Sequence, residues 1–133
     1  TEISLTLKAA MEMGYNRIWA IFQPFTFSRT ARFLDDFAEA LSFADITILT
    51  DIMGSREKNT FNIFAKDLGN KIDGCIYFAQ DENEEPNDER KNFNFQQVCD
   101  YVCENAQGGD LIITLGCGDV YKVAKMIYKK LNG

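Results

Sequence analysis

Residues 17–23 read Arg-Ile-Trp-Ala-Ile-Phe-Gln, and this stretch decides the fold. It is almost continuously apolar and has the length of one strand, which is typical of a parallel β-strand buried on both faces. Pro24 follows at once and ends the strand, because proline has no N–H to donate to a neighbouring strand. The stretch therefore predicts an inner strand of a parallel sheet.

Strands and helices alternate on both sides of this stretch, as their hydrophobic periodicity indicates. The predicted strands are residues 17–23, 46–50, 75–79 and 110–115, and the predicted helices are residues 2–14, 28–41, 65–72, 95–106 and 120–131. Ser28 and Asp119 are expected to cap the helices that follow the first and last strands. The alternation predicts an α/β fold of three layers, with a mostly parallel sheet and helices on both faces.

The composition is that of one globular domain that lacks the commonest acid–base catalyst. The 133 residues suffice for a single domain, and the formal net charge of −6 argues against nucleic acid or an anionic membrane as a partner. The chain has no histidine, so it lacks the usual general base near neutral pH and the commonest zinc ligand. We therefore expect no metal site, no nucleic-acid partner and no membrane partner.

The start of the chain and its cysteines bear on its compartment. Residues 1–5 have no basic or long apolar segment of a signal peptide, and no apolar run is long enough to span a bilayer, so a cytoplasmic location is expected. The chain starts with Thr1 rather than methionine, as expected of one domain of a longer polypeptide. Cys99 and Cys103 are spaced to share a helix face, where we expect small core side chains rather than a disulfide.

Ligands of open α/β sheets bind beyond the carboxyl ends of the strands. Four loops lie at such positions, namely those after residues 23, 50, 79 and 115. In the first loop, Thr26 and Ser28 provide hydroxyls, and Arg29 provides a guanidinium that matches a carboxylate or a phosphate. A helix that starts at Ser28 also favours an anion. Two interpretations stay open here: an anion site, or a serine cap beside a solvated arginine.

The loops after the second and fourth predicted strands carry the other candidates. Arg56 and Glu57 can orient a charged substrate if they face the cleft, although a solvated surface loop is the commoner interpretation. Gly116 and Gly118 allow the backbone to approach a ligand closely, and Asp119 follows them. The chain has no Gly-x-x-x-x-Gly-Lys-Ser/Thr phosphate loop and no complete catalytic set, so no catalytic residue is predicted within it.

Several of these motifs, taken in order, resemble the UDP-N-acetylmuramate–L-alanine ligases, a branch of the Mur ligase family. Residues 22–30, Phe-Gln-Pro-Phe-Thr-Phe-Ser-Arg-Thr, resemble the family block Phe-Gln-Pro-His-Thr-Tyr-Ser-Arg-Thr. Thr-Glu-Ile at residues 1–3, Asp-Ile and Arg-Glu within residues 51–57, and Gly-Cys-Gly-Asp-Val at residues 116–120 are similar to further family blocks. The matches are collinear and extend from residue 1 to residue 123.

The resemblance implies a Rossmann-like C-terminal domain that brings the incoming amino acid, while two upstream domains bind the UDP-sugar and ATP. In these ligases ATP activates the muramoyl carboxylate as an acyl phosphate, which the amine of L-alanine attacks. The resemblance thus implies that ATP and Mg²⁺ are bound mainly by a central domain outside this chain, and that the isolated domain is inactive. The implied partners are UDP-N-acetylmuramate, L-alanine and the upstream domains, in the synthesis of the peptidoglycan cell wall.

The resemblance also assigns roles to individual positions. It implies that Arg29 helps to hold the amino-acid carboxylate or the transferred phosphate. The substrate-binding positions that it implies are Phe25, Thr26, Ser28, Arg29, Arg56, Glu57, Gly116, Gly118 and Asp119. Phe25 and Phe27 depart from the family, which has histidine and tyrosine there, and Met53-Gly54 replaces Tyr-Ala. A phenyl ring cannot form the hydrogen bonds of a histidine imidazole or a tyrosine hydroxyl. The alternative function is therefore a diverged binding module without catalytic activity.

Overall fold

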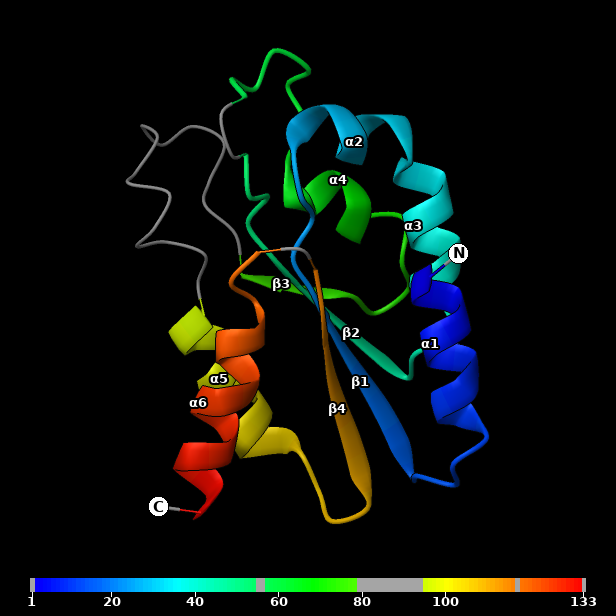
Figure 1. Ribbon diagram of the computed structural model, residues 1–133, viewed down its shortest axis with the longest axis vertical. Helices are drawn as coiled ribbons and strands as arrows, with labels where there is room; N and C mark the ends of the chain where they lie inside the picture. The colour runs from blue at the N-terminus through cyan, green and yellow to red at the C-terminus, as the bar shows by residue number, and fades with distance from the viewer. Residues whose placement is uncertain (1, 55–56, 79–94, 117, 133) are drawn as a thin grey trace.

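A computed structural model describes residues 2–54, 57–78, 95–116 and 118–132. Its centre is a four-stranded parallel sheet in the order β3-β2-β1-β4 (Figure 1). The strands are β1 (Arg17–Phe22), β2 (Ile46–Thr50), β3 (Ile76–Phe78) and β4 (Asp110–Leu115). The predicted α/β fold with a parallel sheet is confirmed, and residues 17–22 form an inner strand that pairs with β2 on one side and β4 on the other.

Helices cover both faces of this sheet (Figure 1). The helices are α1 (Glu2–Met11), α2 (Phe27–Arg32), α3 (Leu34–Leu41), α4 (Ala65–Gly69), α5 (Phe95–Asn105) and α6 (Tyr121–Asn132). The core on one face joins β1 to α1, α3 and α4 and includes Ala20 and Phe22, whereas the core on the other face joins β1 to α5 and α6 and includes Trp19 and Ile21. Alternate side chains of β1 therefore enter different cores, which explains why the strand is apolar from Ile18 to Phe22.

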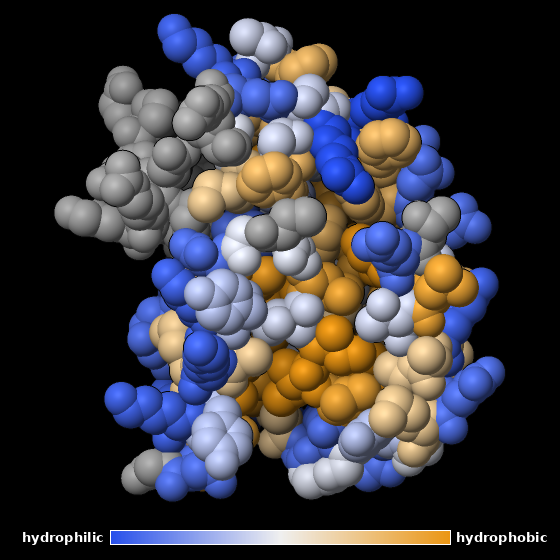
Figure 2. Space-filling model, viewed as in Figure 1, coloured by the Kyte–Doolittle hydropathy of each residue, from blue (hydrophilic) through white to orange (hydrophobic). Residues whose placement is uncertain are grey.

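The strand β4 lies at one edge of the sheet. Among the described residues it pairs only with β1, and all six of its residues are half-buried. Figure 2 shows apolar surface at this edge, between the helices that cover the two faces. The residues of β4 are less buried than those of β1 because an edge strand has a neighbouring strand on one side only.

The predicted helix over residues 28–41 is two helices in the structure. Phe33, with φ −110° and ψ 25°, separates α2 from α3. The helix α2 begins at Phe27, and Thr26 is its N-cap, since the Thr26 hydroxyl accepts a hydrogen bond from the Arg29 N–H. The prediction that Ser28 caps this helix was therefore wrong, because Ser28 lies inside the first turn.

Other element boundaries differ by a few residues from the predicted ones. The first helix ends at Met11 rather than residue 14, and the helix predicted to run to residue 72 ends at Gly69. The strand predicted over residues 75–79 spans Ile76–Phe78 among the described residues. The loop predicted over residues 80–92 lies outside the described residues.

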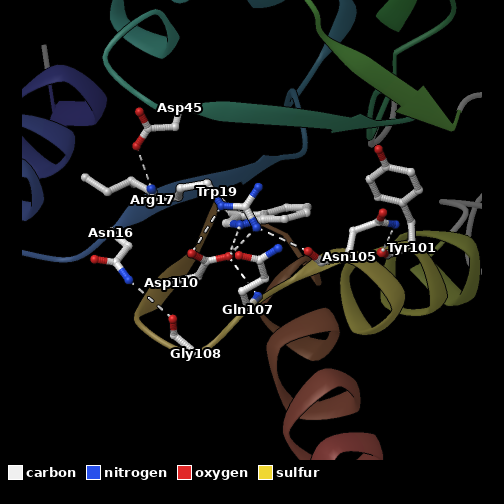
Figure 3. A network of polar contacts seen from close by, with 10 residues as sticks. Asn16, Arg17, Trp19, Asp45, Tyr101, Asn105, Gln107, Gly108 and Asp110 are labelled. Carbon is white, nitrogen blue, oxygen red and sulfur yellow. Dashed lines mark hydrogen bonds and ion pairs between the residues drawn. The ribbon is translucent and has the colours of Figure 1, made fainter.

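An acidic residue fastens the amino ends of β1 and β4 (Figure 3). The Asp110 carboxylate accepts hydrogen bonds from Arg17 Nη2 at 2.7 Å, from Trp19 Nε1 at 2.9 Å and from the Gln107 N–H at 3.0 Å. Only 2% of its side chain is exposed. The hydrogen bond from Arg17, followed by that from Gln107, lowers the pKa of Asp110 to about 2. The carboxylate is thus charged and paired at the end of the sheet opposite the loops considered below.

Three cysteines are free thiols among the described residues, namely Cys75, Cys99 and Cys103. The prediction that Cys99 and Cys103 do not form a disulfide is confirmed, and Cys99 is buried in the core beside α6. Burial raises the pKa of both Cys75 and Cys99 to about 11. In the part of the chain that the structure describes, no helix is long and apolar enough to cross a membrane.

Candidate functional site

The order of the strands creates a candidate site between β1 and β4. The chain leaves β1 toward α2 and α3, and α3 packs on one face of the sheet. It leaves β4 toward α6, which packs on the other face. Ligands of open α/β sheets bind at such a switch point, because the two diverging connections leave a crevice at the carboxyl ends of the strands. The loops after Phe22 and Leu115 therefore form the candidate site.

The loop after β1 is fastened to the loop after β2. The Met53 N–H donates to the Pro24 carbonyl at 2.8 Å, and the Thr26 N–H donates to the Met53 carbonyl at 2.8 Å. These bonds form a short parallel bridge between Phe25 and Met53. The two loops, which are far apart in the sequence, thus form one continuous wall beside the crevice.

Thr26 has a backbone conformation that is unusual for a β-branched residue. Its φ is 63° and its ψ is 146°, close to a region that glycine alone populates freely. Its carbonyl accepts a hydrogen bond from Thr30 Oγ1 at 2.7 Å, and its hydroxyl caps α2. The surrounding hydrogen bonds hold this conformation, and strained residues of this kind cluster at ligand sites.

The carboxylate of Glu57 occupies the amino end of α2. It accepts hydrogen bonds from the Ser28 N–H at 3.0 Å and from the Ser28 hydroxyl at 2.5 Å. These bonds, with a further one from the Phe27 N–H, lower the pKa of Glu57. Ser28 and Glu57, which the sequence analysis places in separate loops, are therefore in contact. However, the anion at this helix start is the protein's own carboxylate, so the Ser28 N–H is not open to an external anion in this arrangement.

Gly116 and Gly118 pack against Gln23, the first residue after β1. A Cβ on Gly116 would lie 3.0 Å from the Gln23 carbonyl oxygen, and a Cβ on Gly118 would lie 3.1 Å from Gln23 Oε1. Gly116 also has a φ of 150°, which side chains rarely adopt. The two glycines therefore permit a close approach of the backbone to Gln23, while their approach to a ligand stays a prediction.

Three of the remaining predicted positions follow β1 or β4 in the chain. Arg29 lies in α2 and is exposed, Phe25 is half-buried in the bridged wall, and the Asp119 carboxylate lies 3.5 Å from the ammonium of Lys122. Arg56 lies outside the described residues. Sequence reasoning missed Gln23 and Met53 as parts of the site. A polar side chain at the carboxyl end of a buried strand was the available signal for Gln23.

The described residues contain no group of three or more His, Cys, Asp or Glu side chains that could hold a metal ion. The sequence has no phosphate-loop motif of the kind that cradles a nucleotide triphosphate. The described residues near the crevice offer backbone, hydroxyl, carboxamide, guanidinium and carboxylate groups. Such groups can bind and orient a small polar ligand.

No family model matches the chain. The chain does match curated proteins, and the three relatives given below are UDP-N-acetylmuramate–L-alanine ligases. The ligase of Acetivibrio thermocellus is 43% identical over 97% of this chain, that of Lachnospira eligens is 38% identical over 96%, and that of Clostridium botulinum strain Langeland is 41% identical over 95%. The chain spans about a quarter of their length, namely 25%, 26% and 25% respectively. The predicted resemblance is thereby confirmed: over nearly its whole length the chain is related to a domain-sized part of the UDP-N-acetylmuramate–L-alanine ligases, as expected of their C-terminal domain.

Proposed function

We propose that this chain is the C-terminal domain of an ATP-dependent, amide-forming ligase that adds L-alanine to UDP-N-acetylmuramate in cytoplasmic peptidoglycan synthesis. The observation that carries the proposal is the 43% identity over 97% of the chain to such a ligase. The arrangement of the loops supports it, since the two sequence blocks at residues 22–30 and 116–120 come at the carboxyl ends of the adjacent strands β1 and β4. Both blocks therefore meet at the crevice where a small substrate binds in this class of fold.

In this proposal the chain positions the amino acid. The exposed guanidinium of Arg29 binds the carboxylate of L-alanine, or the transferred phosphate, through two parallel hydrogen bonds. The glycine loop after β4 closes on the substrate from the opposite side. The further positions proposed to line the cleft are Phe25, Thr26, Ser28, Arg56, Glu57, Gly116, Gly118 and Asp119.

ATP and Mg²⁺ are assigned to another part of the ligase in this proposal. The reason is the donor set of this chain, which offers no phosphate loop. When bound, ATP supplies the activation of the sugar carboxylate. The isolated chain is therefore proposed to be inactive, with UDP-N-acetylmuramate and the upstream domains as its partners in the complete enzyme.

A chimera tests the proposal. The segment of the Acetivibrio thermocellus ligase that matches this chain is replaced by the chain itself, and phosphate release is measured with ATP, UDP-N-acetylmuramate and L-alanine. We expect release that requires both L-alanine and the sugar nucleotide, and none from the isolated chain. A folded chimera that shows no turnover with any amino acid would overturn the ligase proposal, and turnover by the isolated chain would overturn its proposed inactivity.

A second candidate function is a non-catalytic binding module related to these ligases. The observation that favours it is the loss of two polar groups from the wall of the site, at Phe25 and Phe27. Phe25→His and Phe27→Tyr restore the family residues in the chimera. A gain of turnover identifies a weakened ligase, whereas an inactive chimera that stays inactive after both changes favours the binding module.

A further inference from the structure

Gln23 buries an unpaired carboxamide in the candidate site. Its side chain is 1% exposed, and neither Oε1 nor Nε2 has a hydrogen-bond partner among the described residues. Its backbone N–H donates to the Leu115 carbonyl at 3.0 Å, which continues the pairing of β1 with β4 by one residue. The carboxamide is therefore held at the point where the two strands part.

A thin layer separates this carboxamide from the wall formed by the loop after β2. A Cβ on Gly118 would lie 3.1 Å from Gln23 Oε1 and 3.7 Å from Met53 Cγ, so Gly118 lies next to both side chains. Glycine has no side chain of its own, and methionine changes rotamer readily. Because the carboxamide is buried, a ligand can reach it only when neighbours such as Gly118 move.

Stability does not explain a glutamine at this position. A buried polar group without a partner destabilises a protein, because it gives up hydrogen bonds to water and gains none in return. A buried unsatisfied group in a native structure therefore requires another reason, such as a role in binding. Methionine has a similar length and volume and would fill the same space without this loss.

We infer that Gln23 is a further binding residue of this site, and that its carboxamide recognises the α-amino acid. The inference rests on the proposed function, which places L-alanine in this crevice. A carboxamide has a donor and an acceptor side by side. An α-amino acid carries an acceptor carboxylate and a donor amine on one carbon, so Gln23 Nε2 donates to the carboxylate while Oε1 accepts from the amine. Binding moves Gly118 and Met53 away from the carboxamide.

The first test measures the unfolding of the chain itself. Gln23→Met removes both unpaired atoms, and we expect the urea midpoint to rise. Gln23→Leu removes the same atoms with a different shape and should also raise the midpoint, unless it leaves a cavity that methionine fills. Gln97→Met is the matched control, because Gln97 is exposed on α5 and its replacement should leave the midpoint unchanged. A lower midpoint for Gln23→Met would show that the carboxamide is paired in solution, for example with a buried water, and would overturn the inference.

The second test uses the ligase chimera described above. With ATP and UDP-N-acetylmuramate saturating, Gln23→Met should raise KM for L-alanine by about tenfold or more, since hydrogen bonds to two charged groups are lost. KM for UDP-N-acetylmuramate should stay within about twofold, and Gln97→Met should change neither value. An unchanged KM for L-alanine in the Gln23→Met chimera would overturn this inference while leaving the proposed function intact. A chimera that is inactive with Gln23 in place would instead count against the proposed function, and with it against L-alanine as the ligand.

Discussion

The aromatic ring of Phe27 lies where a side chain on residue 54 would begin. A Cβ built on Gly54 would be 2.4 Å from Cε2 and 2.9 Å from Cζ of Phe27. Both residues depart from the ligase pattern, which has tyrosine and alanine at these positions. The two departures are therefore in contact, and the absence of a side chain at position 54 is what lets this ring pack there.

Gly54→Ala should consequently destabilise the chain. We expect the free energy of unfolding to fall by about 1–3 kcal/mol, because the new methyl group overpacks the space that Phe27 fills. Urea denaturation measures the change. Gly108→Ala is the control, since a Cβ there meets nothing within 4 Å, and it should change stability by about 0.5 kcal/mol or less.

A double-mutant cycle separates this contact from a general effect of alanine. Leucine at position 27 lacks the ring atoms that face Gly54, so Phe27→Leu combined with Gly54→Ala should lose less stability than the two single changes together. Strict additivity of the two losses would show that the ring and the methyl group do not compete for space.

Thr26 offers a test of backbone strain in the site. Thr26→Ala and Thr26→Gly both remove the hydroxyl that caps α2, but only glycine relieves the positive φ of 63°. The glycine variant should therefore unfold with a free energy about 1 kcal/mol higher than the alanine variant. Thr6, which is exposed in α1, is the control. There the alanine variant should have the higher free energy of unfolding, by about 1 kcal/mol, because glycine is the poorer helix former. If the alanine variant were the more stable one at both positions, the backbone at Thr26 would not be strained.

The stability contributed by Asp110 should depend on pH. The pKa of this carboxyl is about 2 in the folded chain, below its ordinary value of 3.8, chiefly because Arg17 donates to it. The stabilisation is therefore complete above the ordinary value and is lost as the pH falls through about 2. Urea midpoints of the wild type and of Asp110→Asn should differ near neutral pH and converge toward about pH 2.

The matched control for that pH series is Asp35→Asn. The Asp35 carboxylate is 87% exposed and pairs with Lys71 in solvent, so its removal should change the midpoint little at any pH. A gap between the wild type and Asp110→Asn that persists undiminished at about pH 2 would show that geometry, rather than charge, explains the role of Asp110.

Two of the cysteines should react slowly with thiol reagents. Burial raises the pKa of Cys75 and Cys99 to about 11, so only about one thiol in a thousand is a thiolate at pH 8. Alkylation by iodoacetamide, mapped by peptide mass spectrometry, should be slow at both positions in the native chain and fast in urea. Equal rates in the two conditions would contradict the burial of these thiols.

Local sequence patterns were sufficient for the sheet but not for the path of the chain after β1. The apolar run from Ile18 to Phe22 indicates burial directly, because an inner parallel strand is covered on both faces and is therefore mostly apolar. The break at Phe33 is different, since the helical hydrogen bonds from Phe33 to Arg29 and from Phe37 to Phe33 continue across it. The hydrophobic spacing of residues 28–41 does not show that the helix axis changes direction at Phe33. With this bend the Phe37 ring contacts Phe22, and the two ring centroids are 5.2 Å apart.

The candidate site was predictable as a set of loops but not as a set of contacts. The rule for open sheets points to the loops at the carboxyl ends of the strands, and the predicted strands were enough to list those loops. At the amino end of α2 the Ser28 N–H donates to Glu57, which lies 29 residues away in the sequence, so a local pattern cannot show this bond. The packing of Gly118 against Gln23 and Met53 likewise joins three separate loops, and no local pattern shows it.

The Asp110 cluster and the crevice at Gln23 lie at opposite ends of the same two strands. One end ties β1 to β4 through charged hydrogen bonds, while the other releases two loops to opposite faces. The contacts that tie the two strands together are therefore separate from the loops of the candidate site. Substitutions in those loops leave the tie at the far end untouched, so a scaffold of this kind can keep its fold while its loops change.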